Sequence, residues 1–320
     1  MFKKLGNIFT FVFIGGLSML LICSLANSAD FPRKSVKIIA TADVGGGEDT
    51  EARGLAPFLQ KYLGVNVVVE NQGGAGGKIA FEKFQRTEPD GYSLVLFTFP
   101  KSIIIEYMGK VNYRTRDFTP IYAWSRMNQL LVVHVDNWKT FDEFFKAAKT
   151  KPLAGALMGR GSTTHLAGLL AMGELGLKVN WVPYEGSGQA VAALAGKHVD
   201  FMIGLSTSAI SLIEAGKLRP LIFFNDERDP FMPDIPIPKD LGYNITSIPA
   251  TRCAMTPPNT PASIAKVLEE AFSKAVKEPS YIEWAKKRKM VIYTNNAQEF
   301  GKMVRDTYPV VEKYQQMLKE

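Results

Sequence analysis

One short polar segment contains the strongest candidate binding chemistry in the sequence. It reads Gly-Arg-Gly-Ser-Thr-Thr-His and stands directly before a helix-like stretch. Its glycines allow the backbone to turn its amides inward, and unpaired amides at a helix start favour an anion. An arginine could add a two-pronged contact to a carboxylate. We therefore predict a carboxylate site at Arg160, Gly161, Ser162, Thr163 and Thr164, although a helix N-cap at Ser162 or Thr163 is the alternative interpretation.

A loop rich in glycine and carboxylates is the second candidate. Residues 43–49 read Asp-Val-Gly-Gly-Gly-Glu-Asp and follow an apolar run. A dinucleotide site would need Gly-x-Gly-x-x-Gly, but Thr50 stands where the last glycine belongs and carboxylates crowd the place of a pyrophosphate. The loop therefore disfavours a nucleotide. We interpret Asp49 as the cap of the following helix and expect Asp43 to meet a donor group of a ligand.

Patterns that support catalysis or metal binding are absent from the sequence. Its three histidines lie far apart, and residues 204–208 lack the last glycine of a nucleophile elbow. His165 is a candidate ligand contact, although a lone histidine in a first helical turn is typical of a packed or capping residue. We expect no cofactor, no metal and no enzymatic activity. A secreted hydrolase or transferase is the alternative from another class.

Alternating strand-like and helix-like segments must position these loops. Before about residue 130, apolar runs alternate with helix-like stretches, and the same alternation restarts afterwards, which indicates parallel sheets covered by helices. Two such blocks predict two α/β lobes, with a ligand at the carboxyl ends of the strands. The expected strands are 36–40, 65–70, 92–97, 130–133, 154–158, 179–183, 199–203 and 218–223, and the expected helices include 49–62, 261–277, 280–289 and 297–318.

The first 29 residues have the organisation of a secretory signal peptide. Two lysines precede a long apolar run, and small residues follow it at Ala26, Ser28 and Ala29. We therefore expect a periplasmic protein, with a transmembrane anchor as the alternative. A lipid anchor on Cys23 is disfavoured because bulky Ile22 precedes it.

The charge pattern limits the classes of partner. The net charge is +7, and the positive residues are scattered, with 286–289 the only dense run. No basic stripe interleaved with aromatic residues is present, so we expect no nucleic-acid partner. We expect a monomer.

Six short motifs occur in the order typical of one receptor family. The chain resembles the solute-binding receptors of tripartite tricarboxylate transporters, the Bug family of extracytoplasmic receptors. The motifs that support the resemblance lie at 45–53, 68–77, 89–92, 161–168, 182–187 and 215–219. The resemblance implies a type II periplasmic-binding-protein fold, with two α/β lobes, a ligand cleft between them and two crossover strands. It also implies that a small organic acid is delivered to integral membrane permease subunits.

The resemblance further assigns site residues and domains. The carboxylate loop at 161–164 would face Val44, Gly45 and Gly46, and Thr98 and Ser206 would occupy matching strand ends. Phe99 and Tyr184 complete the expected contacts. The implied domains are a signal peptide at 1–29, a first lobe at 30–130 plus 251–320 and a second lobe at 131–250. Hinge motion is expected near 132–134 and 250–254.

Five positions depart from the family pattern and bear on the ligand. The chain has Thr41-Ala42 in place of Pro-Phe, Asp43 in place of a neutral residue, Glu185 in place of a basic residue and Gly204 in place of an aspartate. The added negative charge disfavours a plain tricarboxylate. We expect a monocarboxylate, an aromatic acid or a zwitterion, and a sensory receptor is the alternative to a transport role.

Overall fold

The computed structural model describes residues 31–159, 161–184, 186–248 and 250–319. The predicted signal peptide, Cys23, Arg160 and Glu185 lie outside these ranges. Within them, none of the helices combines the length and the apolar character needed to cross a membrane.

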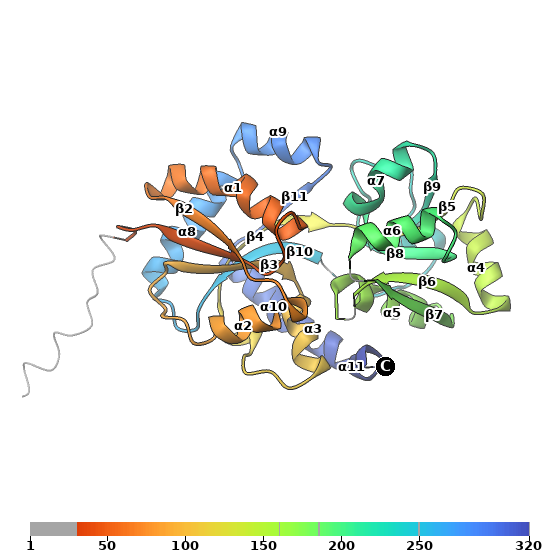
Figure 1. The fold of residues 1–320 in the computed structure, drawn as a ribbon, viewed down its shortest axis with the longest axis horizontal. Coiled ribbons are helices and arrows are strands. Elements are labelled where there is room, and N and C mark those ends of the chain that lie inside the picture. Colours follow the sequence, from red (N-terminus) through yellow and green to blue (C-terminus); the bar gives the residue numbers. More distant parts are fainter. Residues whose placement is uncertain (1–30, 160, 185, 249, 320) are drawn as a thin grey trace, which may run out of the picture.

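The first sheet lies at one end of the long axis of the molecule (Figure 1). Within the described ranges its strand order is β11-β4-β10-β3-β1-β2. The strands β1, β2 and β3 are parallel, whereas β10 runs antiparallel to β3 and β4. Its strands are β1 (Val36–Ala40), β2 (Val67–Asn71), β3 (Ser93–Phe99), β4 (Thr119–Met127), β10 (Ala250–Thr256) and β11 (Val291–Asn295).

Alternation along the strands of this sheet builds two apolar layers. On β3, Leu94 and Leu96 point to one layer, while Val95, Phe97 and Phe99 point to the other. Helices α1 and α8 cover the first layer, and α2, α3 and α10 cover the second. The helices of this part are α1 (Gly47–Leu63), α2 (Lys78–Phe84), α3 (Lys101–Met108), α8 (Ala262–Ala275), α9 (Pro279–Lys287), α10 (Ala297–Lys313) and α11 (Gln315–Lys319).

The second sheet lies at the other end of the molecule, with the order β7-β6-β8-β5-β9 among the described residues. Strand β6 is parallel to β7 and β8, and β5 is antiparallel to β8 and β9. Its strands are β5 (Gln129–His134), β6 (Leu153–Met158), β7 (Val179–Tyr184), β8 (Phe201–Leu205) and β9 (Leu218–Phe223), and its helices are α4 (Phe141–Thr150), α5 (Thr163–Glu174), α6 (Ser187–Ala195) and α7 (Ser206–Glu214). The predicted architecture of two α/β lobes is confirmed.

The chain passes from the first sheet to the second at Asn128, between β4 and β5, and returns to the first sheet after β9 and before β10. The hinges expected near 132–134 and 250–254 would lie in β5 and β10, the strands that follow these two connections, and they stay a prediction. Residues 132 and 133 are paired with both β8 and β9, and His134 is paired with β9. Residues 251–254 are paired with both β3 and β4. Neighbouring strands therefore hold most of both segments on two sides.

Helix α5 belongs to the second lobe but is also packed against the first. Leu166 and Leu170 lie in the same apolar cluster as Ile103 of α3 and Leu318 of α11. At the far end of α5, Glu174 Oε1 accepts a hydrogen bond of 2.8 Å from the hydroxyl of Tyr314. The lower part of the boundary between the lobes in Figure 1 is therefore a packed apolar interface.

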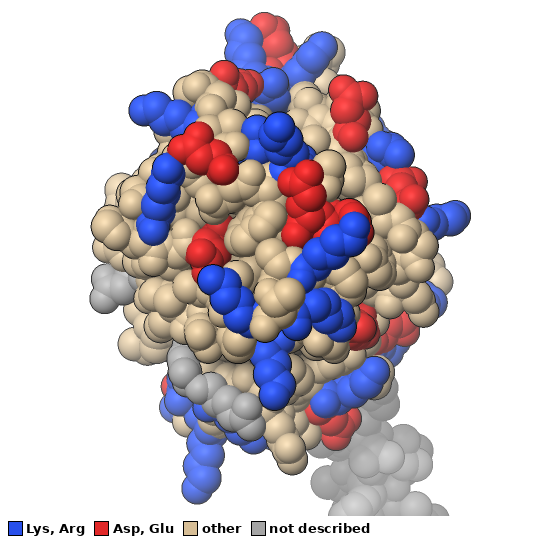
Figure 2. Space-filling view, turned by 90° about the vertical axis from the view of Figure 1, so that its right-hand side faces the viewer, with Lys and Arg blue, Asp and Glu red and all other residues tan. Residues whose placement is uncertain are grey.

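Lysine and arginine side chains are interspersed with aspartate and glutamate side chains on the end face of the second lobe (Figure 2). Opposite charges are neighbours there, for example Lys197 and Asp136 at 2.7 Å. This face therefore carries a mixed charge pattern.

Candidate functional site

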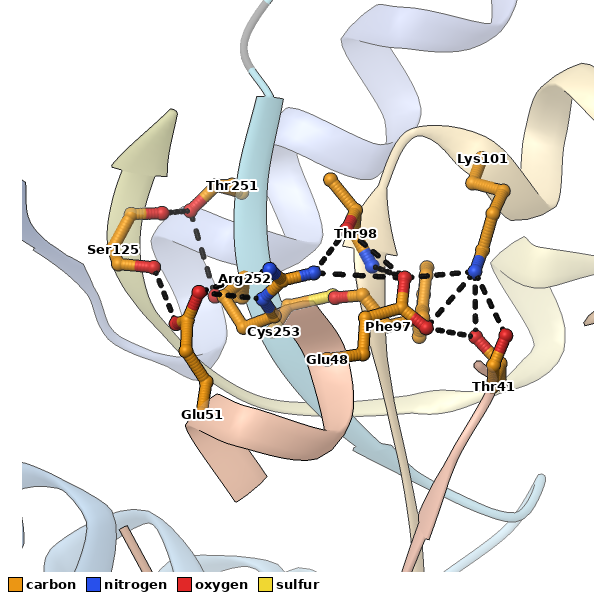
Figure 3. A network of polar contacts seen from close by, with 10 residues as sticks. All are labelled: Thr41, Glu48, Glu51, Phe97, Thr98, Lys101, Ser125, Thr251, Arg252 and Cys253. Atoms are coloured by element: carbon orange, nitrogen blue, oxygen red, sulfur yellow. Dashed lines mark hydrogen bonds and ion pairs between the residues drawn. The ribbon is translucent and has the colours of Figure 1, made fainter. Parts of the chain in front are cut away.

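A buried cluster of charged side chains lies in the first lobe, where it links the start of α1 to β3, β10 and the start of α3 (Figure 3). Glu48 lies in the first turn of α1, and its carboxylate is 7% exposed. Its Oε1 accepts hydrogen bonds from both the amide and the hydroxyl of Thr98, each at 2.9 Å, and its Oε2 accepts one from Thr41 Oγ1 at 2.7 Å. The carboxylate therefore joins the carboxyl ends of β1 and β3.

Lys101 neutralises Glu48 from the start of α3. Its Nζ lies 2.7 and 3.0 Å from the two carboxylate oxygens of Glu48, and it also donates to Thr41 Oγ1 at 2.8 Å. Burial raises the pKa of Glu48, but the positive charges of Lys101 and Arg252 outweigh burial and hold this pKa at about 2. Glu48 is therefore ionised at neutral pH.

Arg252 connects Glu48 to a second buried acid. Its Nε and Nη2 lie 3.0 and 2.9 Å from Glu51 Oε1, and its Nη1 lies 3.6 Å from Glu48 Oε1. The same guanidinium donates to Thr98 Oγ1, and Ser125 Oγ donates to the other oxygen of Glu51 at 2.9 Å. The cluster thus contains two glutamates and two cationic side chains, whose formal charges cancel.

The predicted site did not include Glu48, Glu51, Lys101 or Arg252. A usable signal existed in the spacing of the two glutamates, which are three residues apart and so share one helix face. That face also contains Ala52 and Leu55, which are buried against the sheet. Two acids on a buried face require cations nearby, but which cations meet them depends on strand pairing far along the chain.

Two amides of the glycine loop before α1 donate hydrogen bonds to acceptors within the loop and in the first turn of α1. Gly45 donates its amide to Asp49 Oδ2 at 2.8 Å, and Gly46 donates its amide to the carbonyl of Asp43 at 3.0 Å. The interpretation of Asp49 as the helix cap is wrong. Gly46 occupies that position without a side-chain cap, and Asp49, at the third helical residue, reaches back to the loop and pairs with Arg53 at 2.8 Å.

Asp43 and Val44 lie at the exposed tip of this loop. The carboxylate of Asp43 packs against Gly73, where a Cβ atom would lie 2.0 Å from Asp43 Oδ1. Val44 is 79% exposed. The residue at 73 must therefore be a glycine for Asp43 to take this position.

Ser162 caps α5 in the second lobe, as the capping interpretation predicted. Its Oγ accepts from the amide of His165 at 3.1 Å and shares a hydrogen bond of 3.0 Å with Thr164 Oγ1. Gly161 donates its amide to His165 Nδ1 at 3.2 Å. Thr163, Thr164 and His165 are buried, which agrees with the interpretation of His165 as a packed residue. The amides of Thr163 and Thr164 stand in the first turn, where helix geometry supplies no intrahelical acceptor.

The remaining predicted contacts are dispersed. The Phe99 ring lies in the apolar core of the first lobe, edge-on to Phe300 at a centroid distance of 5.6 Å. Tyr184 ends β7 and accepts the amide of Gly159 on its carbonyl at 2.7 Å. Ser206 begins α7, is buried, and donates its amide to the carbonyl of Asn128 at 3.0 Å. Of the predicted site residues that the structure describes, only Thr98 joins the charged cluster.

Two cavities open between the lobes. The first has a volume of about 440 Å³ and joins Lys101, the 75–76 turn and the end of α3 to residues 158–159 and 161–162 of the second lobe. Volumes of this order are usual for small-molecule sites. Within the described ranges, no group of three or more His, Cys, Asp or Glu residues is arranged to hold a metal ion.

The second cavity has a volume of about 300 Å³ and lies beside α9. It is lined by Arg126, Arg252 and Arg288 of the first lobe, and Thr207 faces it from the second. Two ion pairs join the lobes on this side, Arg126–Glu227 at 2.6 Å and Lys289–Glu214 at 3.2 Å. The second cavity is thus bordered by polar contacts, in contrast to the apolar interface along α5.

Two α/β lobes with a cleft between them define the class of solute-binding proteins with the Venus-flytrap fold. Residues 51–320 match the family described as "Tripartite tricarboxylate transporter family receptor". The chain belongs to this receptor family, as the motif order had indicated.

Three relatives illustrate the match. Protein BugT of Bordetella pertussis is 31% identical over 266 residues, which cover 80% of this chain and 81% of that protein. A TctC solute-binding protein from Polaromonas, solved without ligand, is similar with a TM-score of 0.77 at 27% identity, covering 88% of this chain and 98% of that one. MatC from Rhodopseudomonas palustris, solved with bound malate, has a TM-score of 0.76 at 26% identity, covering 89% and 100%.

Proposed function

We propose that this receptor captures a small organic acid in the first cavity and delivers it to the permease subunits of a tripartite tricarboxylate transporter. The observation that carries the proposal is the first cavity itself, where the polar start of α5 faces Lys101 across the cleft. First-turn amides and the Ser162 hydroxyl are suited to a carboxylate, and relatives in this family include one with bound malate.

We also propose the bounds of the two lobes, the cellular location and the oligomeric state of the protein. The lobes are 30–130 plus 251–320 and 131–250, and the chain crosses between the sheets near both boundaries. We further propose that the protein is a periplasmic monomer released from a signal peptide at 1–29. A sensory role, in which the loaded receptor docks on a signalling partner, is the alternative.

Solute binding is expected to stabilise the protein strongly. A ligand present at about 100 times its Kd adds about 2.7 kcal/mol to the free energy of unfolding. A thermal-shift screen of organic, aromatic and amino acids measures this effect, after any retained ligand has been removed by unfolding and refolding and its absence checked by mass spectrometry. A uniformly flat response from stripped protein would contradict the proposal.

Ser162→Ala is expected to raise the Kd of the best acid about tenfold or more, because a hydrogen bond to a charged group contributes about 1.5 kcal/mol or more. Arg160→Ala should act in the same direction. Titration calorimetry gives the Kd, and a thermal melt of each free variant separates lost binding from the lost helix cap. Arg288→Gln in the second cavity is the matched control and should leave the Kd unchanged. If Arg288→Gln alone weakens binding, the acid binds in the second cavity.

A further inference from the structure

The first cavity has one polar end and one apolar wall. The polar end is formed by Ser162, Gly161 and Lys101. The apolar wall is contributed by both lobes and consists of Ile105, Met108, Val111 and Met158. A Cβ atom at Gly161 would lie 2.3 Å from Met108 Sδ, so the Met108 side chain packs directly on the Gly161 backbone. The apolar wall therefore reaches the place where the α5 amides begin.

The ammonium of Lys101 is already satisfied. It contacts both carboxylate oxygens of Glu48, at 2.7 and 3.0 Å, and both oxygen atoms of Thr41, at 2.8 and 3.2 Å. Glu48 is ionised, so this pair contributes no net charge to the cavity. A ligand carboxylate at Lys101 would therefore have to compete with a carboxylate that is already in place.

Lys78 is the other cation among the described residues that line the first cavity. Its Nζ donates to the carbonyl of Lys110 at 2.7 Å and lies 3.9 Å from Glu82. The Lys78 side chain is 37% exposed, so solvent screens its charge at the cavity rim. The apolar wall between this rim and Ser162 has no polar side chain that could accept a second carboxylate.

We propose that the solute is a monocarboxylate with an apolar body, bound with its carboxylate at Ser162 and the first turn of α5 and its body against Ile105, Met108, Val111 and Met158. This inference rests on the proposed function. Among the described residues that line the first cavity, the groups that can donate to a carboxylate lie at the polar end, apart from Lys78 at the rim. One carboxylate finds partners there, whereas a second would be buried against methionine and aliphatic side chains, at a large cost in free energy.

A zwitterion is disfavoured by the same arrangement. The described residues that line the first cavity include no aspartate or glutamate, and the nearby Glu48 is fully engaged by Lys101, Thr98 and Thr41. An ammonium group on the ligand would therefore meet no uncompensated acid among the described residues that line this cavity. Of the three ligand classes expected from the sequence, the two that carry one charge and an apolar body fit the cavity.

Titration calorimetry of stripped protein with acids of matched length tests the inference. The series is butanoate, hexanoate and octanoate, with benzoate as an aromatic acid. Adipate and 6-aminohexanoate match hexanoate in length but carry a second charge. We expect the Kd to fall about fourfold for each added methylene until the wall is covered, which corresponds to about 0.8 kcal/mol per buried methylene. Adipate and 6-aminohexanoate should each bind at least about tenfold more weakly than hexanoate.

Met158→Lys is expected to reverse the preference for hexanoate over adipate. A cation in the apolar wall would pair with the second carboxylate of adipate and would remove apolar contact with hexanoate. Met158 is only half-buried, and Val111→Lys, also at a half-buried position, provides a second variant should Met158→Lys fold poorly. Arg288→Gln in the second cavity is the control and should leave hexanoate binding unchanged. Lys78→Met tests whether the rim contributes to adipate binding.

The outcomes separate this inference from the proposed function. If adipate, citrate or 6-aminohexanoate binds more tightly than every monocarboxylate, the inference is overturned while the receptor function stands. Tight adipate binding that is lost in Lys78→Met would also overturn it and would assign the second carboxylate to the rim. If stripped protein binds no acid of any class, the proposed function itself fails.

Discussion

Arg252→Met is expected to lower the free energy of unfolding by about 3–5 kcal/mol. The substitution keeps an unbranched side chain of similar length but leaves Glu51 without its cation and Glu48 with one cation in place of two. Arg252 is 4% exposed and each glutamate is 7% exposed or less, so water cannot replace the lost partner. A loss of this size is a large part of the stability of an ordinary domain.

Urea unfolding measures this loss, and two further variants test its cause. Arg252→Met combined with Glu48→Gln and Glu51→Gln removes the unpaired charges and should recover at least half of the stability. Lys146→Met, which breaks the exposed pair with Asp142, is the surface control and should have little effect. If Arg252→Met and Lys146→Met have equal effects, the buried cluster does not stabilise the fold.

Acid is expected to destabilise the protein through Glu48. The pKa of Glu48 is about 2 in the folded protein, compared with 4.5 for the unperturbed group. Because the folded pKa is the lower one, the stabilisation is complete above pH 4.5 and is lost as the pH falls from 4.5 towards 2. The loss is on the order of 3 kcal/mol, since each pKa unit corresponds to about 1.4 kcal/mol.

The difference in stability between the natural protein and Glu48→Gln isolates this contribution. It should narrow as the pH is lowered from 5 to 2.5, measured by urea unfolding at each pH. The free energy of unfolding of the natural protein alone, measured against pH, would not isolate Glu48. Burial raises the pKa of Glu106, so protonation of that group stabilises the fold as the pH falls, opposite to the effect of Glu48. A difference that stays constant over this pH range would show that Glu48 does not titrate as expected.

The two-block architecture could be predicted because it depends on local pattern. The runs at 36–40, 154–158 and 218–223 were assigned as strands and correspond to β1, β6 and β9. The helix expected at 49–62 was found two residues longer at its start, because Gly47 and Glu48 already take helical geometry. The helix expected at 297–318 is interrupted at Tyr314 and forms α10 and α11.

The missed features depend on contacts between distant parts of the chain. Strand β10 was not predicted because Thr251, Arg252 and Thr256 break its apolar pattern, yet all seven of its residues are buried. Arg252 tolerates burial because Glu51, 201 residues away in the sequence, accepts its hydrogen bonds. Apolar periodicity carries no information about such a pairing, which also explains why the charged cluster was absent from the predicted site.

The packed interface along α5 sets the direction in which the cleft can open. Moving Leu166 and Leu170 away from Ile103 would expose apolar surface, at about 25 cal/mol per Å², and would break the hydrogen bond between Tyr314 and Glu174. We therefore expect the lobes to rotate about an axis near α5, with the gap widening on the opposite side, where α7 and α9 lie in Figure 1.

We therefore expect the solute to enter past Arg126 and Lys289, and their ion pairs with Glu227 and Glu214 to separate as the cleft opens. Salt weakens such partly exposed pairs. The rate at which the cleft opens should consequently rise with ionic strength, although the carboxylate is proposed to bind at the far end of the same cleft.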